Sequence, residues 1–158
     1  MTIIINDRDI GISPIVGKPP SCYCRLVLTN TKEFMSIPFR YSTHTNEQHY
    51  LSITVEGIAD DIHIENMYAD IKNIALQSQY KNILVNANNV TLDFPMERFL
   101  PLMNRLLPQL VRFNIARLCS LDDYKQDLIQ NVCLSSNVNM KNFTNQTDAE
   151  NWLLKQYP

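Results

Sequence analysis

The order of apolar and polar residues predicts strands alternating with helices from residue 50 onward. Residues 50–56 alternate apolar and polar side chains, which is typical of a half-buried strand, and Gly57 is expected to end it. The run 82–87 is short, apolar in its middle and rich in branched residues. It indicates a central strand whose two faces are both covered. The segment 88–95 that follows is predicted to be a loop at the carboxyl end of this strand, where such folds usually place their function.

Between these strands the apolar positions change to helical spacing. Asp60 or Asp61 is expected to cap a helix whose buried stripe contains Ile64, Met67, Tyr68, Ile71, Ile74 and Ala75. The remaining predicted elements are a strand over 114–119, a helix over 122–132 with a cap at Ser120, a strand over 138–143 and a last helix with a capping box of Thr147 and Glu150.

A long helix is predicted after the central strand. Asp93 is expected to be its capping residue, with Pro95 in the first turn. Pro101 and Pro108 are expected to bend this helix or divide it. Its predicted core face consists of Met96, Phe99, Leu100, Met103, Leu106, Leu107 and Leu110.

The first 47 residues are predicted to be an extension with extra strands, followed by one domain over 48–158. Short strands are expected over 2–5, 24–29 and 34–41, with a polar turn over 43–47. The strand over 34–41 is expected to form a hairpin with the strand over 50–56. The alternation that follows implies βαβ crossovers. The predicted fold is therefore α/β, with a mixed, mostly parallel sheet and helices packed against it.

Four segments resemble the SpoIIAA-like superfamily, which includes the STAS domains and the bacterial anti-sigma-factor antagonists and is related in fold to the CRAL-TRIO domains. The segments are Ile-Thr-Val-Glu-Gly at 53–57, Ile-Leu-Val-Asn-Ala-Asn-Asn-Val at 83–90, Ile-Ala-Arg-Leu at 115–118 and the close at 143–153 with Ala149 and Trp152-Leu153. The resemblance covers about residues 48–156. It implies a SpoIIAA-like fold and a regulatory role through protein contacts.

The phosphorylation switch that the resemblance implies is not expected here. In STAS antagonists an acidic residue follows the central strand, and a serine at the next helix start is phosphorylated. This chain has Asn86 at the acidic position and Leu-Asp-Phe-Pro-Met over 92–96. Thr91 is the hydroxyl nearest to that helix start, and it is interpreted as closing a turn.

Composition and charge exclude several classes of function. The chain has 158 residues, 45% of them hydrophobic, and a net charge of −2, which argues against a general nucleic-acid binder. Arg98, Arg105 and Arg112 recur every seven residues, and a solvated helix face is favoured over a phosphate-binding row. No signal peptide and no apolar run of membrane-spanning length is recognised. A cytoplasmic protein is expected, with no membrane span and no cofactor.

Cysteines and histidines are the candidates for metal or catalytic chemistry: Cys22, Cys24, Cys119, Cys133, His44, His49 and His63. Structural zinc needs two ligand pairs at suitable spacing, and these residues lie on different predicted elements. Gly-rich phosphate loops and HExxH motifs are also missing from the sequence. We expect buried apolar cysteines, no metal site and no enzyme.

The long helix is the strongest functional lead, because it carries Leu102, Val111 and Phe113 beyond its predicted core stripe. Three interpretations follow: a fully buried helix, a partner or self-association surface, or a small apolar cavity lined by Phe94, Met96, Phe99 and Met103. The favoured function is a non-catalytic module that binds a protein partner or a second copy as a homodimer; the alternative is a carrier or sensor of a small apolar, lipid-like ligand. The candidate partner-binding residues are Asn88, Asn89, Thr91, Asp93, Phe94, Met96, Phe99, Leu102 and Met103.

Overall fold

Nine helices and strands occur within the residues that the structure, a computed structural model, describes: 37–45, 50–120 and 124–156. In chain order they are β1 (Arg40–Thr45), β2 (Tyr50–Ala59), α1 (Asp61–Gln77), β3 (Asn82–Leu92), α2 (Met96–Leu110), β4 (Asn114–Leu118), α3 (Tyr124–Ser135), β5 (Asn139–Phe143) and α4 (Gln146–Leu154). The strands expected over 2–5 and 24–29 lie outside the described residues. The boundary between an extension and a domain near residue 47 stays a prediction.

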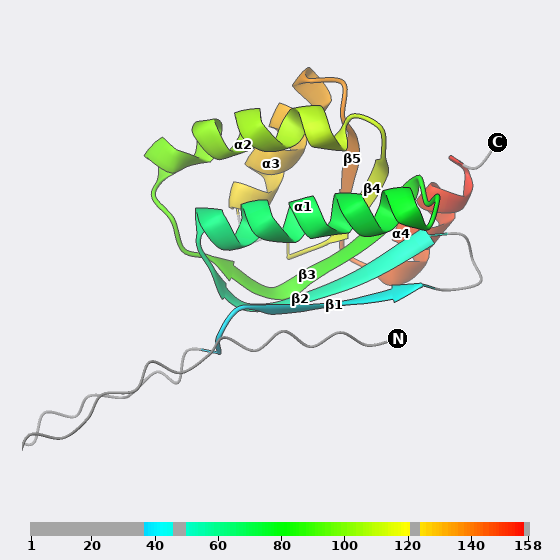
Figure 1. Cartoon of the computed structure of the whole chain (residues 1–158), viewed down its shortest axis with the longest axis horizontal. Helices are drawn as coiled ribbons and strands as arrows, with labels where there is room; N and C mark the ends of the chain where they lie inside the picture. Colours follow the sequence, from blue (N-terminus) through cyan, green and yellow to red (C-terminus); the bar gives the residue numbers. More distant parts are fainter. Residues whose placement is uncertain (1–36, 46–49, 121–123, 157–158) are drawn as a thin grey trace, which may run out of the picture. The chain divides into compact units, whose positions relative to one another are not determined.

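The five strands form one sheet in the order β1-β2-β3-β4-β5 (Figure 1). β1 is antiparallel to β2, and the other three pairings are parallel. The mixed, mostly parallel sheet and the hairpin are confirmed. The hairpin's first strand starts at Arg40 and runs to Thr45, so the expected turn over 43–47 is wrong in its first half.

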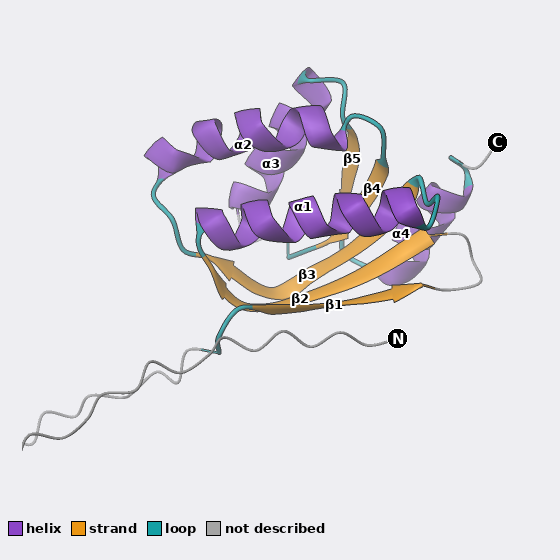
Figure 2. Cartoon of the chain, in the orientation of Figure 1, coloured by secondary structure: helices purple, strands orange, loops and turns teal. Residues whose placement is uncertain are grey.

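Helices cover both faces of this sheet. α1, α2 and α3 lie on one face and α4 lies on the other, as Figure 2 shows. Successive side chains of β3 divide between two cores. Ile83 and Val85 pack in the larger core with α1, α2 and α3, while Leu84 packs with Ala149 and Leu153 of α4. The apolar run at 82–87 therefore is the central strand that its composition predicted.

Asparagines fix the register of the parallel strands at their amino ends. Asn114 Nδ2 donates to Asn82 Oδ1 at 2.8 Å, and Asn139 Nδ2 donates to Asn114 Oδ1 at 2.8 Å. The same three residues are register partners across β3, β4 and β5. Asn82 is buried, and its Nδ2 donates to the Leu153 carbonyl at 3.1 Å. Because a buried amide needs its hydrogen bonds, this row disfavours a slipped register.

β2 and β3 are both longer than expected. β3 continues to Leu92, so the loop predicted over residues 88–95 is strand in its first part. The register passes from Thr54 opposite Asn86 to Glu56 opposite Asn89, which inserts one extra residue in β3 as a β-bulge. The prediction failed because β2 offers a pairing edge beyond residue 56, which no local pattern in β3 reveals.

Gly57 lies inside β2 and does not end it. Its φ is +93°, and a Cβ at this position would lie 2.3 Å from the Pro38 carbonyl oxygen. The segment before β1 crosses β2 here, where the Ile58 amide donates to the Ile37 carbonyl at 3.1 Å. Glycine is therefore needed both for the backbone conformation and for the close approach.

Gly57→Ala is expected to lower the free energy of unfolding by about 2 kcal/mol or more, because alanine is strained at this φ and collides with backbone. Urea denaturation followed by circular dichroism measures the loss. Ile58→Ala, at a neighbouring residue that is 39% exposed, serves as the control and is expected to cost less. Equal midpoints for Gly57→Ala and the wild type would contradict the crossing.

α2 is rotated relative to its predicted core face. Its buried residues are Phe99, Leu102, Met103, Leu106 and Leu110. Met96 and Leu100 were expected in the core but are 41% and 59% exposed, whereas Leu102, expected off the core stripe, is 2% exposed. The sequence supports either stripe, because apolar residues occupy more than half of the helix circumference.

The helix ends also differ from prediction in detail. Pro95 occupies the N-cap position of α2 in place of Asp93, and α2 runs as one helix through Pro101 and Pro108. Asn145 caps α4 in place of Thr147, accepting from the Asp148 amide at 2.9 Å. For α1 the predicted Asp60 cap is confirmed, since its side chain accepts from the His63 amide at 2.7 Å.

Candidate functional site

One edge of α2 is held against α1 by charged and polar side chains. Arg98 pairs with Asp61 at 3.1 Å, and Arg105 pairs with Glu65 at 2.8 Å. Near the other end of the helix, Lys72 donates to Gln109 at 3.1 Å. The arginine row at seven-residue spacing was interpreted as a solvated face. All three arginines are exposed, in agreement with that interpretation, and two of them also pair with carboxylates of α1.

The side of α2 that faces neither the sheet nor α1 is mainly apolar, with the polar residues Glu97 and Asn104 among its exposed side chains. We define the outer face of α2 by its exposed apolar residues Met96, Leu100, Pro101, Pro108 and Val111. The side chains of Met96, Leu100 and Val111 are 41%, 59% and 50% exposed. Helical spacing places residues 96, 100, 107 and 111 on one line, with the prolines beside it. Leu107 on that line is half-buried.

The two prolines also leave backbone acceptors on this outer face. Proline has no N–H, so the carbonyls four residues earlier, of Glu97 and Asn104, lack their helical donors. Residues 97, 101, 104 and 108 follow each other at helical spacing along one side of α2. The outer face therefore combines exposed apolar side chains with two carbonyls that lack their usual helical donors.

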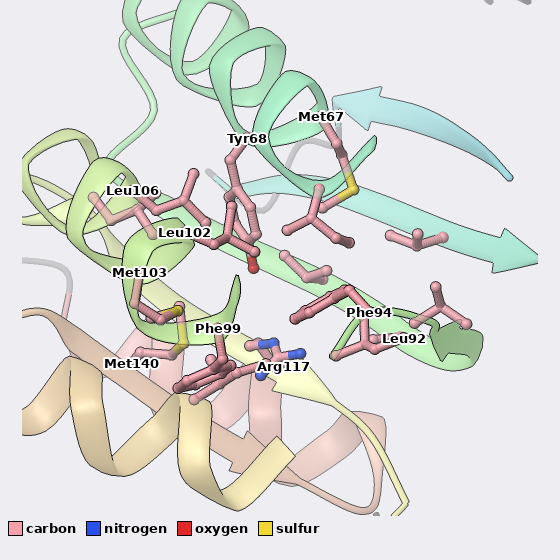
Figure 3. Close-up of a pocket in the computed structure, with 17 residues that line it drawn as sticks. Met67, Tyr68, Leu92, Phe94, Phe99, Leu102, Met103, Leu106, Arg117 and Met140 are labelled. Atoms are coloured by element: carbon pink, nitrogen blue, oxygen red, sulfur yellow. The ribbon is translucent and has the colours of Figure 1, made fainter. Parts of the chain in front are cut away.

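A small cavity of about 40 Å³ lies beneath the inner face of α2. Phe94, Phe99, Leu102 and Met103, all predicted as partner-binding residues, line it and are buried. Figure 3 shows Phe99 and Met103 on one side of the cavity and Tyr68 of α1 on another. The interpretation that phenylalanines and methionines line an apolar cavity agrees with this arrangement except at Met96, which is exposed.

The other predicted partner-binding residues lie at the surface near the carboxyl end of β3. Asn88, Asn89, Thr91 and Asp93 are exposed. The bulge of β3 places Asn88 and Asn89 outside the regular alternation, and the Asn86 side chain accepts from the Asn88 amide at 3.2 Å. The structure therefore divides the predicted residues into a buried group and an exposed group.

Sequence reasoning missed Arg117 as a site residue. It lies on β4, two residues after Ile115 and on the same face, and it is 4% exposed. Its guanidinium points into the cavity (Figure 3). A signal was present: Arg117 is the single charged residue in the apolar run from 115 to 119. An unpaired charge in a strand covered on both faces must meet a buried partner or a ligand.

Burial keeps the ionisable neighbours of Arg117 neutral. Desolvation raises the pKa of Tyr68, although the charge of Arg117 lowers it in part. Burial likewise raises the pKa of the Cys133 thiol to about 11, again opposed by Arg117. Neither group supplies a counter-charge to the guanidinium near pH 7. Among the described residues no ion pair joins Arg117 to a carboxylate.

Most of the described candidate catalytic and metal-binding residues take part in packing or helix capping. The His63 imidazole lies 2.8 Å from the Asp60 carboxylate at the start of α1 and packs on Phe39. Cys119 and Cys133 are buried, while Cys22, Cys24 and His49 fall outside the described part. Within that part, no three His, Cys, Asp or Glu side chains gather as a metal site would require. None of its helices is both long and apolar enough to cross a bilayer.

Cys133 is expected to react with iodoacetamide at pH 8 roughly 100-fold more slowly in the folded protein than in urea. Raising the thiol pKa from 9.0 to about 11 lowers the thiolate fraction by that factor. Peptide mass spectrometry separates Cys133 from the other cysteines. Equal rates in the folded and the denatured protein would contradict a buried, neutral thiol.

Comparison with known proteins shows similarity in structure. The chain matches no protein-family model and no curated protein sequence. Its structure is similar to an uncharacterized protein of the DUF3478 family with a SpoIIAA-like fold from Shewanella loihica PV-4. The TM-score is 0.52 at 12% identity, over 73% of this chain and 93% of that one.

Two structures of SpoIIAA are more distantly similar. The anti-sigma factor antagonist SpoIIAA in its unphosphorylated form has a TM-score of 0.47 at 15% identity, over 77% of this chain and 100% of that one. The Bacillus cell fate determinant SpoIIAA in the phosphorylated form has a TM-score of 0.44 at 16% identity, over 73% and 98%. Similarity at this level concerns the fold alone. The similarity to the DUF3478-family protein shows that the chain has the SpoIIAA-like α/β fold, as the sequence resemblance implied.

Proposed function

We propose that this protein is a non-catalytic cytoplasmic binding module that acts through protein contacts on the outer face of α2, and that the contact is with a second copy of the chain. One observation carries the proposal. The outer face presents Met96, Leu100 and Val111 at 41–59% exposure on a helix whose opposite face is already buried in the core. A contiguous exposed apolar face is typical of an interaction surface.

Charge complementarity supports a two-fold antiparallel pairing of α2 with its copy. Glu97 near the start of α2 and Arg112 just after its end are both exposed, and neither forms an ion pair within the described residues. An antiparallel pair centred on Asn104 brings each Glu97 beside the partner's Arg112. Such a contact is isologous and therefore closes as a dimer.

The centre of this pairing is also self-complementary. Asn104 meets its own copy on the two-fold axis, and an asparagine amide both donates and accepts. The carbonyls freed by Pro101 and Pro108 lie on the same side of α2 and accept such donors. Because of the prolines, this face offers a partner more hydrogen-bond acceptors than an ordinary helix surface does.

The start of α2 supports a module without the phosphorylation switch of STAS antagonists. Residues 93–96, Asp-Phe-Pro-Met, contain no hydroxyl. Thr91, which was predicted to close a turn, lies instead in β3 opposite Ile58, before the helix start. For the non-catalytic part, the supporting observations are that His63 participates in the α1 cap and that burial raises the pKa of the Cys133 thiol.

Leu100→Glu is expected to raise the dimer dissociation constant about 30-fold, because the two new carboxylates, one from each copy, together cost about 2 kcal/mol at central apolar contacts. Analytical ultracentrifugation across a concentration series measures the constant. Leu134→Glu on α3, where the leucine is 56% exposed, is the matched control and is expected to leave it unchanged. A wild-type monomer at high micromolar concentration, or equal constants for both variants, would contradict the proposal.

A charge-reversal pair tests the antiparallel geometry separately. Arg112→Glu alone is expected to weaken the dimer a few-fold, since it places two carboxylates beside one another; rim charge pairs contribute roughly 0.2–1 kcal/mol each. Adding Glu97→Arg is expected to restore the wild-type constant. A double variant weaker than either single variant would show that these residues do not meet, even if Leu100→Glu disrupts the dimer.

A further inference from the structure

The buried guanidinium of Arg117 has more hydrogen-bond donors than it has acceptors around it. Its Nη2 donates to Gln126 Oε1 on α3, and Gln126 is itself buried. Its Nε and Nη1 have no hydrogen-bond partner in the described part of the chain. Guanidinium is charged at all physiological pH values. A buried cation therefore keeps two nitrogens without acceptors, which costs free energy unless another molecule supplies them.

The residues that line the cavity do not supply the missing acceptors, and the buried Oδ1 of Asn142 on the neighbouring strand also has no hydrogen-bond partner in the described part of the chain. Seventeen residues line the cavity, and all except Arg117 and Tyr68 are apolar. The Tyr68 hydroxyl points into the same space as the guanidinium (Figure 3). A neutral hydroxyl offers one weak acceptor and also one donor of its own. The cavity thus has a cationic, hydrogen-bond-donating end and apolar walls.

We infer that the cavity beneath α2 binds a small monocarboxylate with a short apolar chain, its carboxylate accepting from Arg117 and its chain lying among the apolar walls. A carboxylate supplies both the counter-charge and the acceptors, and pairs with guanidinium in fixed planar geometry. Phosphate and sulfate fit less well, because further polar oxygens would face Phe94, Phe99 and Leu92.

The size of the cavity limits the length of the chain. A volume of about 40 Å³ corresponds to about three water molecules at roughly 10–15 Å³ each. The carboxylate alone nearly fills it, so the chain must displace side chains. Met67, Met103 and Met140 line the cavity, and methionine adapts its shape readily. A chain of about four to six carbons is therefore favoured over a long lipid.

This site is independent of the proposed dimer. The cavity lies under the inner face of α2, and the outer face lies on the opposite side of that helix. Failure of one proposal leaves the other standing. The carboxylate site also refines the alternative function that the sequence suggested, a carrier or sensor of a small apolar ligand. It specifies that this ligand has an anionic end group.

The first experiment is a titration of the full-length protein, labelled at its methionine methyl groups, with hexanoate followed by NMR. The signals of Met67, Met103 and Met140 are expected to shift, whereas that of exposed Met96 is expected not to. Hexanol and hexylamine, which share the chain but lack the carboxylate, are the matched ligands and are expected to bind at least about tenfold more weakly. No shift at the three lining methionines, or equal affinities for hexanoate and hexanol, would overturn the inference.

Arg117→Met provides the second experiment, since methionine has similar length and no charge. Replacing an unbalanced buried charge with an apolar side chain is expected to leave the unfolding midpoint unchanged or raise it, while hexanoate affinity falls at least about tenfold. A lower midpoint with unchanged hexanoate affinity would assign Arg117 a purely structural role and overturn the inference.

Arg117→Lys keeps the charge and is the second variant should Arg117→Met fail to fold. It is expected to bind hexanoate more weakly than the wild type but more tightly than it binds hexanol, because an ammonium pairs with carboxylate without the planar fork. A crystal structure with only water on Nε and Nη1 at saturating hexanoate would also overturn the inference.

Discussion

The rotation of α2 about its own axis decides which residues of this protein are available to other molecules. Packing of Phe99, Leu106 and Leu110 against the sheet sets that rotation from inside. The ion pairs of α2 with Asp61 and Glu65 set it from the side. Exposed ion pairs contribute little stability, so burial holds the helix in place and the charges orient it. A rotation by one residue position would exchange Leu100 for Leu102 at the surface.

This dependence explains where sequence reasoning succeeded and where it failed. The central strand, the Asp60 cap and the βαβ order follow from short-range patterns, and each is confirmed. The core face of α2 does not follow, because its sequence carries apolar residues on two sides. Packing against the sheet and pairing with the acidic residues of α1, both far away in sequence, decide which side turns inward. Similarly, Gly57 signals a turn when read locally, whereas it allows a backbone crossing in the fold.

Sequence reasoning missed Arg117 for a similar reason. Ile115, Ala116 and Leu118 are buried strand residues, and no local pattern shows that the single arginine among them is buried with them. The fold places it instead on the face that carries the larger core, beside Tyr68 and under α2. A buried charge is weak support for stability. Its unfilled donors are therefore better explained by a ligand than by the requirements of the fold.

The central claim is that the two faces of α2 have different partners. The inner face packs against the core of its own chain, and the outer face is covered only when a second copy binds. Hydroxyl-radical footprinting of methionine oxidation tests this claim within one helix. Met103 is 4% exposed and Met96 is 41% exposed in the single chain. The account predicts that Met103 stays protected at all protein concentrations, while Met96 oxidises readily in dilute solution and becomes protected as the concentration rises. A Met96 oxidation rate that does not change with concentration would contradict it.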